Sequence, residues 1–167
     1  MILLDKNSRE TAFKTVMGNY PTGVTVITTV DKDGTPVGLT VNSFASVSLD
    51  PTLILWSIDH RVSTLDIFKN AGKFAVHTLA SDQGDICSIF ASKGVDRFAN
   101  CKWELSEQGL PIISGAYGVL QCNTHKQVEA GDHTILIGEV IDIQHEDKEP
   151  LLYHKRKFGK IPEDFYK

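Results

Sequence analysis

The sequence predicts a mainly β protein, an antiparallel barrel with a few short helices at its periphery. Short segments rich in β-branched and aliphatic residues follow one another along the chain, and turn residues separate most of them. Strands and helices do not alternate in the way that builds a parallel sheet, and the chain has no internal repeat. An antiparallel barrel is therefore expected in place of a doubly wound sheet.

The first part of the chain predicts a helix and a β-hairpin. Ser8 is expected to cap the helix, and Phe13, Val16 and Met17 give it an apolar face that closes one end of the core. The following β-branched run, VTVITTV, is typical of a strand, and DKDG after it is typical of a hairpin turn. The expected elements are a helix over 8–19, strands over 24–30 and 36–41, and a turn over 31–34.

The remaining segments predict two further helices and several paired strands. Ser63 is the expected N-cap of the first helix, and Ile86, Ile89 and Phe90 form the expected buried stripe of the second. In the strand over 117–129, alternation assigns Gln121 to the polar, half-exposed face. The expected helices span 61–68 and 82–91, and the expected strands span 53–58, 73–79, 117–129, 133–143 and 150–154.

Size and composition indicate an ordinary globular protein. A chain of 167 residues has the length of one domain, so residues 1–167 are expected to form a single domain. The content of 41% hydrophobic and 23% charged residues is ordinary, and the net charge of −4 argues against a nucleic-acid partner. No apolar run is long enough for a signal peptide or a membrane span, which favours a cytoplasmic location. The cysteines and histidines are scattered, so no metal site is expected.

The stretch GLTVNSFASVSLDPTLILW, residues 38–56, departs from the pattern of a buried strand. It carries the small polar side chains Thr40, Asn42, Ser43, Ser46 and Ser48 among apolar residues. Such a row of hydroxyls, amides and backbone groups suits a flat heterocycle that needs several hydrogen bonds along its edge. From these residues alone, a solvent-facing strand with an ordinary polar surface is an equally good interpretation.

Other common catalytic motifs are missing from the sequence. No G-x-G-x-x-G, Walker loop, G-x-S-x-G elbow or H-E-x-x-H helix is present. A Rossmann dinucleotide site, an α/β-hydrolase triad and a zinc-protease centre are therefore not indicated. Hydrolytic and metal-centred chemistry are therefore not expected.

Four motifs, YPTGVTVITT, GLTVNSFASVSLDP, GDHTILIGEV and PLLYHKRKFG, together resemble the flavin reductase-like family. The resemblance runs from about residue 20 to residue 159. It implies a split β-barrel with Greek-key connections, a homodimer, and an NAD(P)H:flavin oxidoreductase that supplies reduced FMN or FAD to a partner monooxygenase. NADH or NADPH is the implied co-substrate.

The resemblance also implies roles for individual residues. Thr40, Asn42 and Ser43 would line the isoalloxazine edge, and Ala45, Ser46 and Val47 would lie along the ring and the ribityl chain. Ser63 and Thr64, helped by Arg61, would hold the flavin phosphate. Lys93, Arg97, Phe98 and Tyr153 would approach the flavin, and His133 would lie beside the nicotinamide.

Each of these residues also has an ordinary structural interpretation. Arg61 and Lys93 suit exposed surface charges, Phe98 suits the anchor of a loop, and Tyr153 suits core packing. His133 suits a hydrogen bond across a hairpin. The basic residues over 155–160 are expected to be solvated, and the alternative is a contact with the phosphates of the nicotinamide dinucleotide.

Three other functions remain open at this point. The first is a flavoprotein that retains its flavin and acts as an electron carrier or redox sensor. The second is a non-catalytic barrel that stores or delivers flavin or haem. The third is a pyridoxamine phosphate oxidase, which has a related barrel, although the four motifs match the reductase branch.

Overall fold

A computed structural model of the protein describes residues 5–167. The helices are α1 (Lys6–Asn19), α2 (Leu65–Asn70) and α3 (Gly84–Ala91), with 3-10 turns at Phe98–Asn100 and Glu163–Tyr166. The strands are β1 (Thr22–Gly23), β2 (Thr25–Val30), β3 (Pro36–Val41), β4 (Ala45–Leu49), β5 (Thr52–Asp59), β6 (Lys73–Thr78), β7 (Trp103–Leu105), β8 (Pro111–Ile113), β9 (Gly118–Ala130), β10 (His133–His145), β11 (Leu152–His154) and β12 (Lys157–Gly159).

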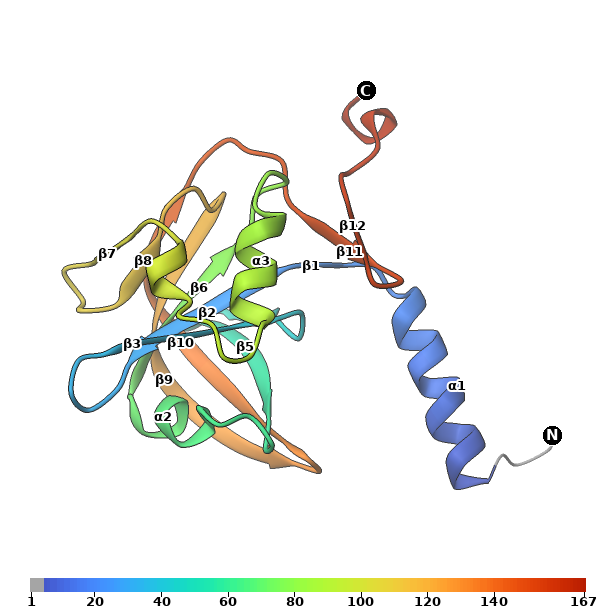
Figure 1. Ribbon diagram of the computed structural model, residues 1–167, viewed down its shortest axis with the longest axis horizontal. Coiled ribbons are helices and arrows are strands. Elements are labelled where there is room, and N and C mark those ends of the chain that lie inside the picture. Colours follow the sequence, from blue (N-terminus) through green and yellow to red (C-terminus); the bar gives the residue numbers. More distant parts are fainter. Residues whose placement is uncertain (1–4) are drawn as a thin grey trace.

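Seven strands form one antiparallel sheet in the order β3-β2-β6-β9-β10-β5-β4. Hairpins join β2 to β3, β4 to β5 and β9 to β10, whereas the connections β3 to β4 and β5 to β6 pass between strands that are not neighbours. This topology confirms the expected mainly β, antiparallel fold with Greek-key connections. Two small sheets, β1-β11-β12 and β7-β8, flank the large one (Figure 1).

The two edge strands of the large sheet, β3 and β4, follow each other in the chain. The short segment 42–44 joins them, so the two edges are held close together, and no ladder of hydrogen bonds closes the sheet there among the described residues. The barrel is therefore split along one line, which we call the seam and define as residues 40–47. The polar stretch that stands out in the sequence forms this seam.

Three apolar clusters make up the core, and two of them contain aromatic rings. In the first, the Trp56 ring packs edge-on against Phe68 and Phe74, with centroid distances of 5.2 and 5.7 Å. The second lies under α3 and contains Phe90. Gly138 is required here because a Cβ atom at this position would lie 2.5 Å from the Phe74 ring.

The hairpin turns form where the sequence predicts them. The Asp31 carboxylate accepts hydrogen bonds from the backbone N–H groups of Asp33 and Thr35, each at 2.9 Å, and Gly34 takes a φ of 82°. Gly131 takes a φ of 67° between β9 and β10. Both turns depend on local side-chain and backbone chemistry, so the sequence alone identifies them.

The structure corrects the prediction for α1. Asp5, not Ser8, is its N-cap, because the Asp5 carboxylate accepts the Ser8 backbone N–H at 3.0 Å. The apolar face does not close the core: the side chains of Phe13, Val16 and Met17 remain 64%, 65% and 47% exposed. Figure 1 shows α1 standing apart from the sheet, with the β11–β12 hairpin near its C-terminal end.

Three smaller predictions also change. The helix expected over 61–68 begins only at Leu65, with Thr64 as an N-cap that makes no side-chain hydrogen bond, so Ser63 is not the cap. Helix α3 buries Cys87 together with Phe90, whereas the expected Ile86 and Ile89 are half-buried.

No helix among the described residues has the length and apolarity needed to cross a membrane.

Gln121 is buried, although the alternation of its strand predicts exposure. Its amide donates to Asp142 Oδ2 at 2.6 Å and its carbonyl oxygen accepts from the Ser106 hydroxyl at 2.6 Å. A buried amide needs such partners, and here they come from β10 and from the loop after β7. The prediction was wrong because neither partner is close to Gln121 in the sequence.

Candidate functional site

Ser43 ties the seam to strand β5. Its hydroxyl accepts the Ser57 backbone N–H at 3.0 Å and donates to the Ser57 carbonyl oxygen at 3.1 Å. One side chain thus replaces a pair of ladder hydrogen bonds where the backbone over 42–44 is irregular. The neighbouring Asn42 is exposed, and its side chain makes no hydrogen bond within the described residues.

Strand β4 presents small side chains and an open edge. Ala45, Ser46 and Val47 are exposed, and a register irregularity between Ser46 and Ser48 leaves Val47 out of the pairing with β5. An edge strand with a bulge offers unpaired backbone groups to a partner. Thr40 lies at the other side of the seam, where its hydroxyl donates to the Cys87 carbonyl oxygen of α3 at 2.8 Å.

The loop after β5 combines a paired arginine with an unpaired threonine. Arg61 donates through Nε to Asp59 Oδ1 at 3.0 Å and through Nη2 to Oδ2, and its backbone N–H donates to Oδ1 at 2.8 Å. The Arg61 guanidinium holds the pKa of Asp59 well below its usual range. The hydroxyl oxygen of Thr64 is buried and has no hydrogen-bond partner. Of the predicted phosphate residues, Ser63 and Thr64 therefore have free hydrogen-bonding capacity among the described residues, whereas Arg61 is engaged.

His133 lies next to this loop, at the start of β10. It pairs with Asp59 across the β10–β5 register, so the two side chains share a face of the sheet. Its Nδ1 atom lies 2.7 Å from Asp132 Oδ1, and its side chain is 39% exposed. The hydrogen bond from His133 holds the pKa of Asp132 below its ordinary value. Two carboxylates thus flank an accessible imidazole ring.

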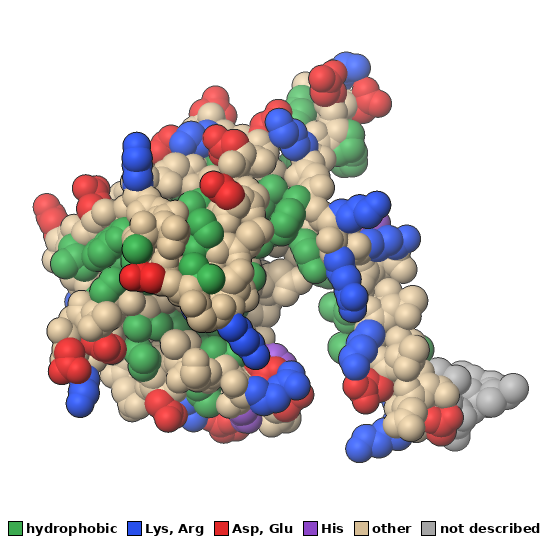
Figure 2. Space-filling model, in the orientation of Figure 1, with side chains coloured by type: hydrophobic (Ala, Val, Ile, Leu, Met, Phe, Trp, Pro, Cys, Tyr) green, Lys and Arg blue, Asp and Glu red, His purple; other side chains and the backbone are tan. Residues whose placement is uncertain are grey.

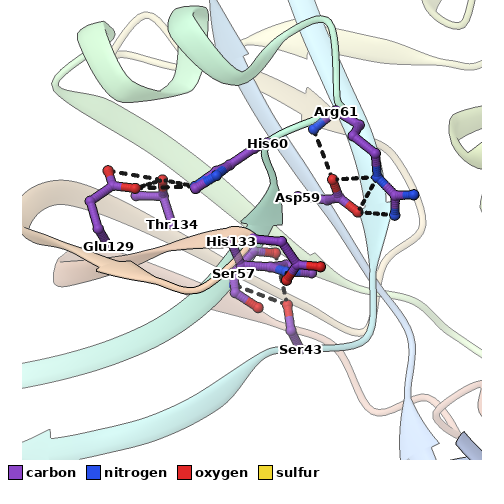
Figure 3. A network of polar contacts seen from close by, with 9 residues as sticks. Ser43, Ser57, Asp59, His60, Arg61, Glu129, His133 and Thr134 are labelled. Atoms are coloured by element: carbon purple, nitrogen blue, oxygen red, sulfur yellow. Dashed lines mark hydrogen bonds and ion pairs between the residues drawn. The ribbon is translucent and has the colours of Figure 1, made fainter. Parts of the chain in front are cut away.

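A polar network clamps the β9–β10 hairpin to the loop after β5 (Figure 3). His60 Nε2 lies 3.1 Å from both Thr134 Oγ1 and Glu129 Oε2. Glu129 Oε1 accepts from Lys69 Nζ of α2 at 2.8 Å, and the His60 backbone N–H donates to the Asp132 carbonyl oxygen at 3.0 Å. This clamp fixes the loop that carries Thr64 relative to the hairpin that carries His133.

Lys93, Arg97 and Phe98 lie in the segment that follows α3. Arg97 donates to the backbone carbonyls of Gly38 and Ser92, and Lys93 is exposed. The Phe98 ring packs edge-on between Phe90 and Trp103, at centroid distances of 5.2 and 5.3 Å. Arg97 and Phe98 thus anchor the loop after α3 to the barrel, whereas Lys93 makes no hydrogen bond or ion pair within the described residues.

Tyr153, in contrast, lies beside the seam. It lines a cavity of about 410 Å³ together with Thr40 and Asn42, between β3, α3 and the β11–β12 hairpin. The structure therefore brings the predicted residues into two neighbouring groups that meet at the seam. One group contains Thr40, Asn42 and Tyr153. The other group contains Ser43, Arg61, Ser63, Thr64 and His133, and Asp59 lies between Arg61 and His133.

Sequence reasoning missed Glu129, Lys69 and Thr134 of the clamp and the anchor role of Ser57. Glu129 and Lys69 lie 60 residues apart in the chain, so no local spacing marks them. The only sequence signals are the adjacent Asp132-His133 pair and the Asp59-x-Arg61 spacing. Among the described residues, no group of three or more His, Cys, Asp or Glu side chains could hold a metal ion.

Comparison with known proteins places this geometry in a family. The Flavin reductase like domain matches residues 17–162. The chain is 41% identical over 156 residues to "FMN reductase (NADH) SmoA" from Agrobacterium fabrum, which covers 93% of this chain and 87% of the relative. It is 35% identical over 153 residues to "Flavin-dependent monooxygenase, reductase subunit HsaB" from Rhodococcus jostii, which covers 91% of this chain and 78% of the relative.

A solved structure gives the same result. The "NADH:FAD oxidoreductase SgcE6 in complex with NAD and FAD fragments" from Streptomyces globisporus superimposes with a TM-score of 0.88 at 36% identity. The match covers 98% of this chain and 99% of that one. Because the family match extends over residues 17–162 and the relatives cover nearly the whole chain, this protein belongs to the flavin reductase-like family.

Proposed function

We propose that the protein is an NADH-dependent flavin reductase that passes a hydride to FMN or FAD and supplies reduced flavin to a partner monooxygenase. The names of the relatives support each part of this statement: an FMN reductase that uses NADH, an NADH:FAD oxidoreductase, and a reductase subunit of a flavin-dependent monooxygenase. The observation that carries the proposal is the seam, with its exposed polar residues, beside an accessible histidine.

The residues present fit a flavin. The isoalloxazine ring would lie against the open edge of β4 at Ala45, Ser46 and Val47, with Asn42 supplying hydrogen bonds. The buried Thr64 hydroxyl lacks a partner, which is a cost that a phosphate oxygen would remove. Helix α2 has only 6 residues, so the hydroxyls of Ser63 and Thr64, not a helix dipole, would hold the phosphate.

When bound, the flavin supplies the hydride acceptor, and the protein binds and orients the reactants. The role proposed for His133 is to contact the nicotinamide carboxamide. Its Nδ1 faces Asp132, which leaves the second ring nitrogen for a ligand. Hydride transfer needs alignment of two rings and no proton-transfer triad, so His133 acts by orientation.

The proposed roles of Arg61, Lys93, Arg97 and Phe98 are indirect. Arg61 would stabilise the phosphate loop through Asp59, and Arg97 would fix the backbone of β3 next to Thr40. Phe98 would hold the loop after α3 through its aromatic neighbours, and the exposed Lys93 would remain solvated. Tyr153 would bound the cavity beside Asn42.

The test is the oxidation of NADH and NADPH by the purified protein with FMN, FAD or riboflavin added in excess. The proposal expects an NADH oxidation rate that rises and saturates with added FMN or FAD. A bound flavin that is reduced once, with no response to added flavin, would favour the retained-flavin electron carrier. No flavin reduction at all would favour a storage barrel and would contradict the proposal.

The proposed assembly is a homodimer. Helix α1 leaves Phe13, Val16 and Met17 exposed, and a second copy would cover them. The use of reduced nicotinamide also agrees with the cytoplasmic location that the sequence predicts. The partner monooxygenase would accept reduced flavin by diffusion or by contact.

A further inference from the structure

The turn between β11 and β12 is strained in an unusual way. His154 pairs with Lys157, so the turn consists of Lys155 and Arg156 alone. Their φ angles are 49° and 63°, in the left-handed region, and no other non-glycine residue among residues 5–167 has a positive φ. A two-residue turn of this kind favours Asn-Gly, so two long cationic side chains at these positions carry a conformational cost.

The strained turn places Arg156 at the cavity beside the seam. Arg156 lines the cavity of about 410 Å³ together with Thr40, Asn42 and Tyr153, and no acidic side chain lines it. Lys155 does not line this cavity and faces a different one, next to Pro21 and Lys160. The two residues of one turn therefore have different surroundings.

The guanidinium of Arg156 has no ion-pair or hydrogen-bond partner among the described residues. By contrast, Arg61 is paired with Asp59, and Arg97 is bound to two backbone carbonyls. Lysine and arginine side chains gather over the β11–β12 hairpin in Figure 2, in a chain with a net charge of −4. An unpaired guanidinium at the wall of a cavity that no acidic side chain lines is suited to a phosphate group.

The position of the cavity identifies the phosphate. Ser63 and Thr64, which the proposed function assigns to the flavin phosphate, do not line this cavity, whereas Asn42 lies between the two regions. With FMN as the flavin, an anion held by Arg156 therefore belongs to the second ligand, the nicotinamide dinucleotide. We propose that Arg156 binds a phosphate of the nicotinamide dinucleotide and that the strained turn holds its guanidinium at the cavity. This inference rests on the proposed function.

The first variant is Arg156→Gly, with Lys155→Gly as its matched control. Glycine adopts the left-handed region without strain, so both variants are expected to keep or raise the thermal midpoint. Only Arg156→Gly is expected to raise the KM for NADH, by about tenfold, the loss expected for one charge-assisted contact. The KM for FMN should stay unchanged in both variants.

Salt and a conservative variant sharpen the test. Added NaCl should raise the wild-type KM for NADH and have a smaller effect on Arg156→Gly, because salt screens an exposed ion pair. Arg156→Lys keeps the charge and should recover part of the affinity. A KM for NADH that rises no more in Arg156→Gly than in Lys155→Gly would overturn the inference, and so would a rise in the KM for FMN alone.

Calorimetric titration with NAD⁺ separates this inference from the proposed function. If wild type fails to reduce flavin yet binds NAD⁺, and Arg156→Gly weakens that binding about tenfold, the inference stands without the reductase. If wild type reduces flavin and the variants bind NAD⁺ equally, only the inference fails. If wild type neither reduces flavin nor binds NAD⁺, both fail.

Discussion

His133 is the residue whose substitution tests the orientation of the nicotinamide. Replacement by alanine removes the ring between Asp132 and Asp59. We expect His133→Ala to raise the KM for NADH by about tenfold, as expected for the loss of one good ligand contact. Steady-state kinetics with varied NADH at saturating FMN measure this effect.

The control for His133 is a histidine of similar exposure on the same hairpin. His125 of β9 has a side chain that is 43% exposed and lies outside the clamp. His125→Ala should leave the KM for NADH unchanged. Unaltered kinetics in His133→Ala would refute the orientation role.

His77 makes the stability of the fold depend on pH. Its side chain is fully buried, Nδ1 lies 3.1 Å from the Val26 carbonyl oxygen, and Nε2 accepts the Ile113 backbone N–H at 3.0 Å. Burial lowers the pKa of His77 to about 4, so the neutral ring is the folded form. The unfolded chain binds a proton more readily, and stability is therefore complete above the unfolded pKa and falls as the pH drops towards 4.

The expected loss in the free energy of unfolding is about 2 kcal/mol between pH 7 and pH 5, at roughly 1.4 kcal/mol per pH unit below 6.5. Urea unfolding at the two pH values measures it. The His77→Gln variant, which has no titratable ring, should show a smaller pH dependence over this interval. Equal slopes for wild type and variant would contradict the account of His77.

At the level of elements, the proposed homodimer depends on α1. Phe13 and Val16 are exposed on one face of a helix that packs little against the barrel. The double variant Phe13→Ser, Val16→Ser should weaken the dimer at least about a hundredfold, since each buried apolar side chain contributes roughly 1.5–3 kcal/mol. Light scattering after size exclusion should report twice 18.5 kDa for wild type and a single chain for the variant.

Lys14→Ala is the control on the same helix. Lys14 forms an exposed ion pair with Glu10, of the kind that contributes little to stability. Its loss should leave the dimer intact. A wild-type protein that remains a monomer at micromolar concentration would rule out the role given to α1.

At the level of the whole molecule, local signals predicted the strands, the hairpin turns and the barrel, because alternation and turn chemistry are short-range properties. Contacts between distant segments were not predictable in this way. The burial of Gln121 depends on Ser106 and Asp142, and the clamp depends on Glu129 meeting His60. The exposure of α1 likewise depends on packing that the helix's own sequence does not specify. That residues 1–167 form a single domain stays a prediction.

The candidate site was likewise predictable only where local sequence signals mark it. The polar stretch was identified from its departure from strand chemistry, and it became the seam because β3 and β4 are the edges of the sheet. The split into two groups of residues, and the pairing of Arg61 with Asp59, required the three-dimensional structure. Arg156 was expected to be solvated and is exposed, but a charge run gives no indication of the strained turn that carries it.

The central claim is that the seam and the loop after β5 hold the flavin that is reduced. It is tested most directly by comparing Thr64→Val with Thr124→Val, since both threonines carry a buried hydroxyl without a partner but only Thr64 lies in the proposed phosphate loop. We predict that Thr64→Val raises the KM for FMN about tenfold or more while the KM for riboflavin, which lacks a phosphate, is unchanged. Thr124→Val should alter neither KM. Equal KM values for FMN in wild type and Thr64→Val would contradict the account.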